Sequence, residues 1–177
     1  MNRKAVFLDR DGVINRALVI AGRPYPPSTL AELEILPGVE SALAHLHTDY
    51  LLIVVTNQPD VARGTKSKGE VEAINCALAQ KLPIDEFCVC YHDETDRCHC
   101  RKPAPGLLLQ AAERQQIDLH KSFMIGDRWR DIEAGYLAGC RTFFIDYGYK
   151  EKQPEQVDYV VSSLEEASRI IMQLNGE

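Results

Sequence analysis

The sequence predicts an α/β fold with a mainly parallel central sheet and helices on both faces of that sheet. Two observations along the 177 residues support this prediction. Short, β-rich apolar runs alternate with stretches of helical pattern, and this order of elements implies right-handed crossovers between parallel strands. The apolar runs are continuous rather than alternating with polar residues, as in strands that are covered on both faces.

The expected strands are all short apolar runs. In chain order they are AVFLD (5–9), LLIVVTN (51–57), EFCVCYH (86–92), SFMIGD (122–127), CRTFFIDY (140–147) and DYVV (158–161). The helical patterns lie at 37–47, 68–82, 105–117, 131–139 and 162–174. In 105–117, apolar residues recur at near-helical spacing, and Pro105 suits the first turn of a helix. Ser163, followed by Glu166 before an apolar run, has the pattern of a capping box for the last helix.

Length and composition indicate one globular domain, which we expect to span residues 1–177. Hydrophobic residues make up 45% of the chain and charged residues 26%, which is ordinary for a folded protein. Two long irregular stretches remain, at 15–36 and 93–105. Long loops in a compact domain are usually functional or mobile.

The charge balance argues against two classes of partner. The chain has 20 basic and 26 acidic residues, a net charge of −6, whereas surfaces that bind nucleic acid or anionic membranes are basic. The N-terminus has only a four-residue apolar run, at 5–8. A secretory signal needs a longer run and a membrane span needs roughly 20 apolar residues. We therefore expect a soluble, cytoplasmic protein that binds neither nucleic acid nor membranes.

Four polar signals fall at or just after the carboxyl ends of successive expected strands. In a parallel α/β sheet, ligands bind at that edge. The first signal is DRDG at 9–12, where Asp9 and Asp11 are one residue apart and can aim together at a hard cation. Mg²⁺ prefers such carboxylates, together with water and substrate phosphate.

The second and third signals can bind an anion. The hydroxyl of Thr56 and the side-chain amides of Asn57 and Gln58, at the end of the next strand, can donate hydrogen bonds to it. Lys102, beside Pro103 and just ahead of a helix, can offset phosphate charge. Taken alone, the Thr-Asn pair at a strand end is more often a cap, and a single lysine is more often a solvated surface charge.

The fourth signal is Asp127, which ends the strand at 122–127, with Asp131 four residues later. Asp131 alone could be only an N-terminal charge for the next helix. The four motifs D-x-D-G, T-N, K-P and G-D-x-x-x-D, however, follow one another along the chain in this order. This ordered set resembles the motifs of the haloacid dehalogenase superfamily of phosphotransferases. The resemblance covers residues 5 to about 147.

This resemblance implies a Rossmann-like three-layer sandwich and a role for each matched residue. Asp9 would be the nucleophile that forms an aspartyl phosphate, and Asp11 would be the general acid and then the general base. Thr56 would bind the phosphoryl oxygens, and Lys102 would offset their charge. A catalytic Mg²⁺ would be bound by Asp9, Asp127 and the backbone carbonyl of Asp11.

A cluster of cysteines and histidines indicates a second metal site. Four of the six cysteines lie within thirteen residues, which in a cytoplasmic chain indicates metal binding before disulfides. Structural zinc takes four thiolate or imidazole ligands. Along a strand, Cys88 and His92 are about 13 Å apart, too far to share one ion. The predicted Zn²⁺ ligands are therefore Cys90, His92, Cys98 and Cys100.

The pattern C-x-H…C-x-C directly before R-K-P resembles one branch of the superfamily. That branch contains the D-glycero-D-manno-heptose 1,7-bisphosphate phosphatases and the histidinol-phosphate phosphatases. The resemblance implies the absence of a cap domain, a structural zinc ion in the loop, and an arginine, Arg101, that assists substrate recognition. VVTNQ (54–58) and GDRWRDIEAG (126–135) look most like the heptose enzymes. The short gap between His92 and Cys98 looks more like the histidinol enzymes.

The preferred interpretation is a Mg²⁺-dependent phosphatase that removes the C7 phosphate of the heptose bisphosphate, in the synthesis of activated heptose for surface glycans. Arg101 and Arg128 would then pair with the second phosphate. Three alternatives stay open: a histidinol-phosphate phosphatase, a phosphotransferase, and a zinc-centred interaction module without catalysis. The last would have no need for Lys102 or Asp127 at strand ends. A domain without a cap is also expected to be a monomer.

Overall fold

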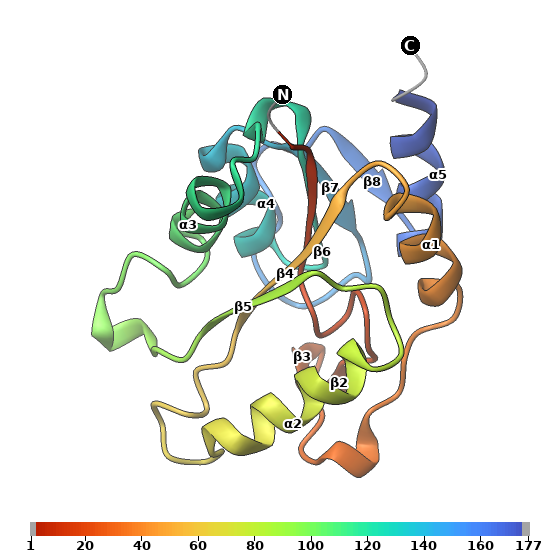
Figure 1. Cartoon of the computed structure of the whole chain (residues 1–177). Coiled ribbons are helices and arrows are strands. Elements are labelled where there is room, and N and C mark those ends of the chain that lie inside the picture. The colour runs from red at the N-terminus through yellow and green to blue at the C-terminus, as the bar shows by residue number, and fades with distance from the viewer. Residues whose placement is uncertain (1–2, 175–177) are drawn as a thin grey trace.

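Six parallel strands form the central sheet, in the order β5–β4–β1–β6–β7–β8 (Figure 1). They are seen in a computed structural model that describes residues 3–174. The strands are β1 (Ala5–Leu8), β4 (Leu51–Asn57), β5 (Glu86–Cys90), β6 (Phe123–Gly126), β7 (Arg141–Ile145) and β8 (Tyr159–Val161). The chain builds outward from β1 to β5 on one side and from β6 to β8 on the other. The order therefore reverses between β1 and β6, and such a switch point is where open α/β sheets bind ligands.

Helices cover both faces of the sheet and create two apolar cores. They are α1 (Val39–Leu46), α2 (Lys68–Ala79), α3 (Gly106–Gln115), α4 (Trp129–Ala138) and α5 (Leu164–Leu174). Side chains of α1, α2 and α5 pack in one core, and side chains of α3 and α4 pack in the other. Within β1, Val6 and Leu8 face the first core while Ala5 and Phe7 face the second. The predicted three-layer α/β architecture is confirmed, and burial on both faces explains the continuous apolar strands.

The ends of the elements differ from the sequence expectation by a few residues. The strand at 86–92 ends earlier, at Cys90, and the helix expected at 131–139 begins earlier, at Trp129. The predicted capping box of α5 forms only in part. Glu166 N–H donates to the Ser163 hydroxyl at 3.1 Å, but the Glu166 carboxylate accepts from Ser162 N–H at 2.8 Å instead of returning to Ser163.

The stretch 15–36, which the sequence suggests is irregular, contains a small antiparallel hairpin. Its strands are β2 (Leu18–Ile20) and β3 (Arg23–Tyr25), and a 3₁₀ turn follows at Leu30–Glu32. The turn residues Ala21 and Gly22 have φ angles of 52° and 82°. Strands of three residues are too short to show an alternating pattern, so the sequence does not reveal them. Further 3₁₀ turns lie at Glu94–Asp96 and Leu119–Lys121. Within residues 3–174 no cap domain is inserted, as expected.

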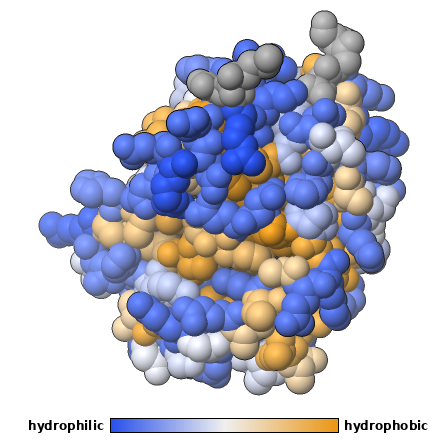
Figure 2. Space-filling model, in the orientation of Figure 1, coloured by the Kyte–Doolittle hydropathy of each residue, from blue (hydrophilic) through white to orange (hydrophobic). Residues whose placement is uncertain are grey.

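The surface seen in Figure 2 is mostly polar, with an apolar band across its middle. The edge strand β5 runs through this region in Figure 1, and its Phe87 and Val89 are only partly buried. Among residues 3–174, every helix is too short or too polar to serve as a membrane span.

Candidate active site and metal centres

The polar residues that follow β1, β4, β5 and β6 come together at the carboxyl edge of the sheet. Asp9 comes directly after β1, and its N–H donates to the carbonyl of Ile125 in β6 at 3.0 Å. A cavity of about 70 Å³ opens at this edge. It is lined by Asp9, Asp11, Pro24, Tyr25, Pro26, Thr56, Asn57, Lys102, Arg128, Arg130 and Asp131. Asp127 lies beside this cavity, because a carboxylate oxygen from each of Asp9, Asp127 and Asp131 falls within 4.8 Å of the others.

Lys102 is the central cation of the site and is almost completely buried. Its Nζ lies 2.8 Å from Asp9 Oδ1 and 2.6 Å from Asp131 Oδ1, and it donates to the carbonyl of Val55 at 2.7 Å. All three ammonium protons therefore have acceptors. Burial alone would lower the pKa of Lys102, but the charges of Asp131 and Asp9 outweigh it and raise the pKa. Lys102 is a permanent cation that holds two carboxylates in place.

The carboxylates carry more negative charge than Lys102 can neutralise. Burial raises the pKa of Asp9 to about 6, with further increases from Asp131 and Asp11, although Lys102 opposes this shift. Burial, together with the charges of Asp9 and Asp131, holds the pKa of Asp127 well above its usual range. Both oxygens of Asp127 are buried and accept no well-formed hydrogen bond from the described residues, although the nearby Tyr149 hydroxyl partly offsets the rise in the pKa of Asp127. A buried carboxylate without a partner is costly. The three carboxylates Asp9, Asp127 and Asp131 therefore form a set of oxygen ligands that fits a hard divalent cation such as Mg²⁺.

Gly12 allows the chain to pass directly against Asp127. Its φ angle is +94°, and a Cβ atom at this position would lie 2.0 Å from Asp127 Oδ2. The Tyr147 hydroxyl donates to the carbonyl of Gly12 at 3.0 Å. Only glycine combines this backbone conformation with the close approach.

The side chains of Asn57 and Gln58 contact protein groups around the cavity. Asn57 Nδ2 donates to the carbonyl of Lys102 at 3.0 Å, and Lys102 N–H donates back to Asn57 Oδ1 at 3.1 Å. Gln58 Nε2 donates to Asp11 Oδ2 at 2.8 Å and to Thr56 Oγ1 at 2.9 Å. Asn57 thus fixes the backbone that carries Lys102, while Gln58 joins Thr56 to Asp11.

Arg128 and Arg130 line the cavity, whereas Arg101 lies outside its lining, and the three arginines have different partners. Arg128 donates from Nε to Glu151 Oε1 at 2.9 Å, so its guanidinium is already engaged by a carboxylate. Arg101 and Arg130 both approach Glu94 Oε1, at 3.7 Å and 2.7 Å. Arg101 Nε is buried and has no acceptor within residues 3–174. Burial, and then the charge of Arg130, lowers the pKa of Arg101. Two guanidinium groups that share one carboxylate form an electropositive pair.

The predicted zinc ligands form a compact tetrad. Cys90 Sγ lies 3.2 Å from Cys100 Sγ, 3.6 Å from His92 Nδ1 and 3.7 Å from Cys98 Sγ. Cys100 Sγ lies 3.2 Å from His92 Nδ1 and 3.4 Å from Cys98 Sγ. Ligands placed 2.1–2.3 Å from zinc at tetrahedral angles are roughly 3.6–3.8 Å apart, so the donor set and its spacing fit Zn²⁺.

The pKa values of the three tetrad thiols shift in different directions: burial raises those of Cys90 and Cys100, whereas that of Cys98 is lowered. Although burial opposes it, hydrogen bonds from Cys100 and neighbouring groups lower the pKa of Cys98, which favours the thiolate that binds metal. Cys88 lies outside the tetrad, with its Sγ near Glu86 and Arg114. Cys140 is buried and Cys76 is exposed.

Several residues of the site escape sequence reasoning. Asp131 belongs to the pattern G-D-x-x-x-D, so its position was visible, but its ion pair with Lys102 was not. Arg10 is fully buried, although a charged residue in a turn is expected at the surface. Pro24 and Tyr25 reach the cavity from the hairpin, and no sequence pattern predicts that approach.

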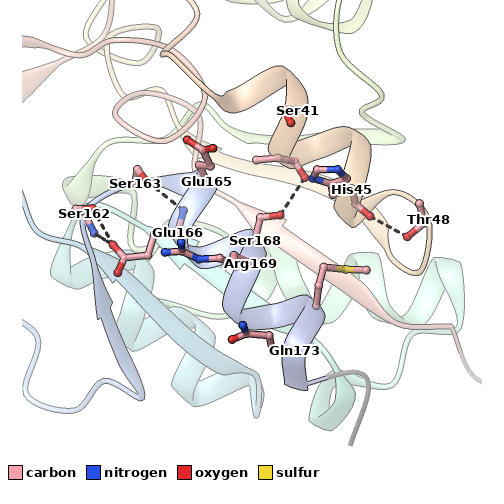
Figure 3. Close-up of a pocket in the computed structure, with 12 residues that line it drawn as sticks. Ser41, His45, Thr48, Ser162, Ser163, Glu165, Glu166, Ser168, Arg169 and Gln173 are labelled. Atoms are coloured by element: carbon pink, nitrogen blue, oxygen red, sulfur yellow. Dashed lines mark hydrogen bonds between the residues drawn. The ribbon is translucent and has the colours of Figure 1, made fainter.

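A larger groove lies between α1 and α5, with a volume of about 950 Å³ (Figure 3). Its polar groups are largely bonded to one another: Ser168 donates to the carbonyl of Ala42, and Glu166 accepts from Ser162. None of the metal-binding groups identified in residues 3–174 lies there. Although this groove is larger than the cavity at the sheet edge, the carboxylate cluster and the Cys/His tetrad both lie outside it.

Comparison with known proteins gives one consistent family. Residues 99–167 match the family model described as HAD-hydrolase-like. A D-glycero-beta-D-manno-heptose-1,7-bisphosphate 7-phosphatase of Pasteurella multocida is 33% identical over 189 residues, which cover 98% of this chain and 100% of the relative. The enzyme of the same name from Helicobacter pylori is 39% identical over 142 residues, covering 76% and 78% of the two chains. A crystal structure of D,D-heptose 1,7-bisphosphate phosphatase from B. bronchiseptica, complexed with magnesium and phosphate, has a TM-score of 0.81 and 31% identity, and the match covers 97% of this chain and 99% of that one.

The sheet, its switch point and the carboxylate cluster define a hydrolase of the haloacid dehalogenase class, with a phosphatase fold. Two of these relatives are more than 30% identical and match over two thirds or more of both chains. The chain belongs to the family of the D-glycero-beta-D-manno-heptose-1,7-bisphosphate 7-phosphatases. It is accordingly an enzyme, a phosphoric monoester hydrolase.

Proposed function

We propose that this protein is a Mg²⁺-dependent phosphomonoesterase that removes the C7 phosphate of D-glycero-D-manno-heptose 1,7-bisphosphate. The strongest structural support for the catalytic part is the Asp127 carboxylate, which is buried close to Asp9 and Asp131 with no well-formed hydrogen bond from the described residues. The names of the relatives support the substrate. The reaction would supply heptose 1-phosphate for synthesis of activated heptose in the cytoplasm, with the enzyme acting as a monomer.

In the first half of the reaction, a carboxylate oxygen of Asp9 attacks phosphorus and the bond between phosphorus and the C7 oxygen breaks. Asp11 donates its proton to the departing oxygen, while Thr56 binds the phosphoryl oxygens and Lys102 offsets their charge. Mg²⁺, bound by Asp9, Asp127 and the carbonyl of Asp11, would screen the charge of the phosphate dianion. Without such screening, a carboxylate and a phosphate dianion repel each other.

In the second half, the Asp11 carboxylate takes a proton from water as the water oxygen attacks the phosphorus of the aspartyl phosphate. The bond between Asp9 and phosphorus breaks, which releases phosphate and restores the Asp9 carboxylate. The covalent route divides one difficult hydrolysis into two easier steps. Asp11 can serve as the base in this step because it gave up its proton in the first half of the reaction.

The tetrad Cys90, His92, Cys98 and Cys100 is proposed to hold a structural Zn²⁺. Arg101 follows Cys100 directly in the chain, and Lys102 comes next. A zinc ion bound there would fix the start of the segment that carries both cations. Its four protein ligands leave no open position, as in structural rather than catalytic zinc sites.

The second phosphate of the substrate is proposed to pair with Arg101, assisted by Arg130. These residues precede Lys102 and Asp131, respectively, whose side chains touch at 2.6 Å, so both arginines flank the catalytic centre. Arg101 Nε has no acceptor among the described residues, but it is buried, so the guanidinium would have to turn toward the cavity to meet the second phosphate. Arg128 also lines the cavity, but Glu151 binds its guanidinium, as Glu94 binds that of Arg130.

Phosphate release from a panel of substrates tests this function. We expect release from heptose 1,7-bisphosphate to depend on added Mg²⁺, to stop when a chelator removes the metal, and to return when Mg²⁺ is restored. The remaining product should carry its phosphate on the anomeric carbon. We also expect kcat/KM for the heptose bisphosphate to exceed that for histidinol phosphate. A ratio below one would replace the heptose substrate by the histidine-pathway alternative.

Arg101→Ala is expected to reduce the preference for a bisphosphate. Charged hydrogen bonds contribute about 1.5–3 kcal/mol, so kcat/KM for the heptose bisphosphate should fall about 10- to 100-fold more than kcat/KM for a simple sugar monophosphate. Arg169→Ala is the control, because Arg169 lies in the groove between α1 and α5 (Figure 3). An unchanged ratio in Arg101→Ala would remove Arg101 from substrate recognition.

A further inference from the structure

Arg10 is a charged side chain with no exposure to solvent, located between the two catalytic aspartates. A buried guanidinium is costly unless it is paired and hydrogen-bonded. Its Nε donates to Asp11 Oδ1 at 3.2 Å and its Nη2 donates to Asp11 Oδ2 at 3.0 Å. Each oxygen of the Asp11 carboxylate is therefore held by one arm of the same planar fork, which fixes the plane of the carboxylate.

The remaining arm of Arg10 is anchored in a different element. Nη1 donates to Asn75 Oδ1 at 2.8 Å, and Asn75 is a buried polar residue of α2. α2 contributes no other side chain to this hydrogen-bonding group in the described chain. A polar residue on the buried side of a helix needs a specific partner, and here that partner is Arg10.

Two amides complete the contacts of Asp11. Asn15 Nδ2 donates to Oδ1 at 3.0 Å, and Gln58 Nε2 donates to Oδ2 at 2.8 Å. Four donors thus fill the four lone-pair directions of the carboxylate. One of them has to give way for Asp11 to carry the proton that it passes to the leaving oxygen. Bonds from charged donors are roughly twice as strong as those from neutral ones, so an amide yields more easily than Arg10.

We propose that Arg10, anchored by Asn75, is a positioning residue that holds the Asp11 carboxyl in the orientation needed to transfer a proton to the leaving oxygen. The proposal rests on the role of Asp11 in the proposed function. It explains why a charged side chain is buried at this point and why an otherwise apolar face of α2 carries an asparagine. Arg10 and Asn75 do not need to touch the substrate.

The leaving group provides a test that a purely structural role would not affect. A sugar or other alkyl phosphate needs a proton on its departing oxygen, and such general acid help contributes about 10²–10⁴-fold. p-Nitrophenyl phosphate has a leaving group that departs without a proton. We expect Asn75→Ala, and likewise Arg10→Lys, to lower kcat/KM for an alkyl phosphate about tenfold or more while changing kcat/KM for p-nitrophenyl phosphate little.

A neighbouring variant on α2 controls for general loosening. Ile74 is buried in the apolar core next to Asn75, so Ile74→Val should lower the melting temperature but leave the alkyl-to-aryl ratio of kcat/KM unchanged. The positioning role is wrong if Asn75→Ala and Arg10→Lys lower kcat/KM equally for the alkyl phosphate and for p-nitrophenyl phosphate. It is also wrong if they leave both values of kcat/KM unchanged or raise the alkyl-to-aryl ratio.

A double variant separates this inference from the proposed function. Asp11→Asn alone should lower the alkyl-to-aryl ratio, and Asn75→Ala should cause no further decrease in that background. If Asp11→Asn leaves the ratio intact, the proposed acid role of Asp11 fails. If Asp11→Asn lowers it but Asn75→Ala lowers it further by the full factor seen in the wild type, the two residues act independently and only the positioning role fails.

Discussion

Asp9→Asn is expected to abolish turnover while leaving the fold intact. The side-chain amide cannot form the aspartyl phosphate, and loss of a nucleophile in an enzyme with a covalent intermediate costs on the order of 10⁶-fold in kcat. Stability should not fall. Asp9 lies close to two other buried carboxylates, Asp127 and Asp131, and burial raises its pKa to about 6, which reflects the cost of ionising it there. Removing one of these charges relieves repulsion.

Two measurements distinguish loss of the nucleophile from damage to the protein. Phosphate release should vanish, and the melting temperature should equal or exceed that of the wild type. Asp49→Asn is the matched control, because Asp49 precedes β4 instead of following a strand and is exposed to solvent. Retention of more than a tenth of the wild-type activity by purified Asp9→Asn would overturn the covalent mechanism.

The parts of the site that the sequence predicts are those that depend on local order along the chain. Asp9, Thr56 and Asp127 come directly at strand ends, and parallel strands necessarily bring their carboxyl ends to one edge. The close approach of Cys90, His92, Cys98 and Cys100 could be predicted for a similar reason. Cys90 and His92 end one extended segment, and the chain returns within a few residues at Cys98.

The parts that could not be predicted are pairings between segments far apart in the chain. Lys102 and Asp131 touch across the switch point, and no periodicity relates their positions. Arg128 was a reasonable candidate for a substrate phosphate, but Glu151 is its partner in the structure. Such choices depend on how loops pack after the sheet has formed, and propensity and pattern do not encode that packing. The burial of Arg10 is the clearest example, since it follows from Asp11 and Asn75 together.

Cys98→Ser is expected to lower zinc content, stability and substrate recognition together. A serine hydroxyl is a poor replacement for a thiolate ligand, and the free energy of metal binding in such a site contributes to folding. A loss of about 3 kcal/mol would lower the melting temperature by roughly 6–12 °C in a chain of this size. Arg101 should be affected more than Lys102. The backbone of Lys102 is also held by two hydrogen bonds to Asn57, whereas Arg101 depends on the loop.

The changes in KM and kcat therefore test whether the proposed zinc ion positions the loop, whereas elemental analysis tests only whether zinc is bound. KM for the heptose bisphosphate should rise more than kcat falls in Cys98→Ser, because the recognition arginine moves while the phosphate-binding lysine stays anchored. Elemental analysis of protein prepared without chelators should find one zinc per chain in the wild type and in Cys76→Ser, whose cysteine is exposed and lies outside the tetrad. Wild-type protein without zinc would refute the metal assignment. Zinc loss that lowers kcat and leaves KM unchanged would instead show that the loop governs Lys102, and that Asn57 does not hold its backbone independently of the metal.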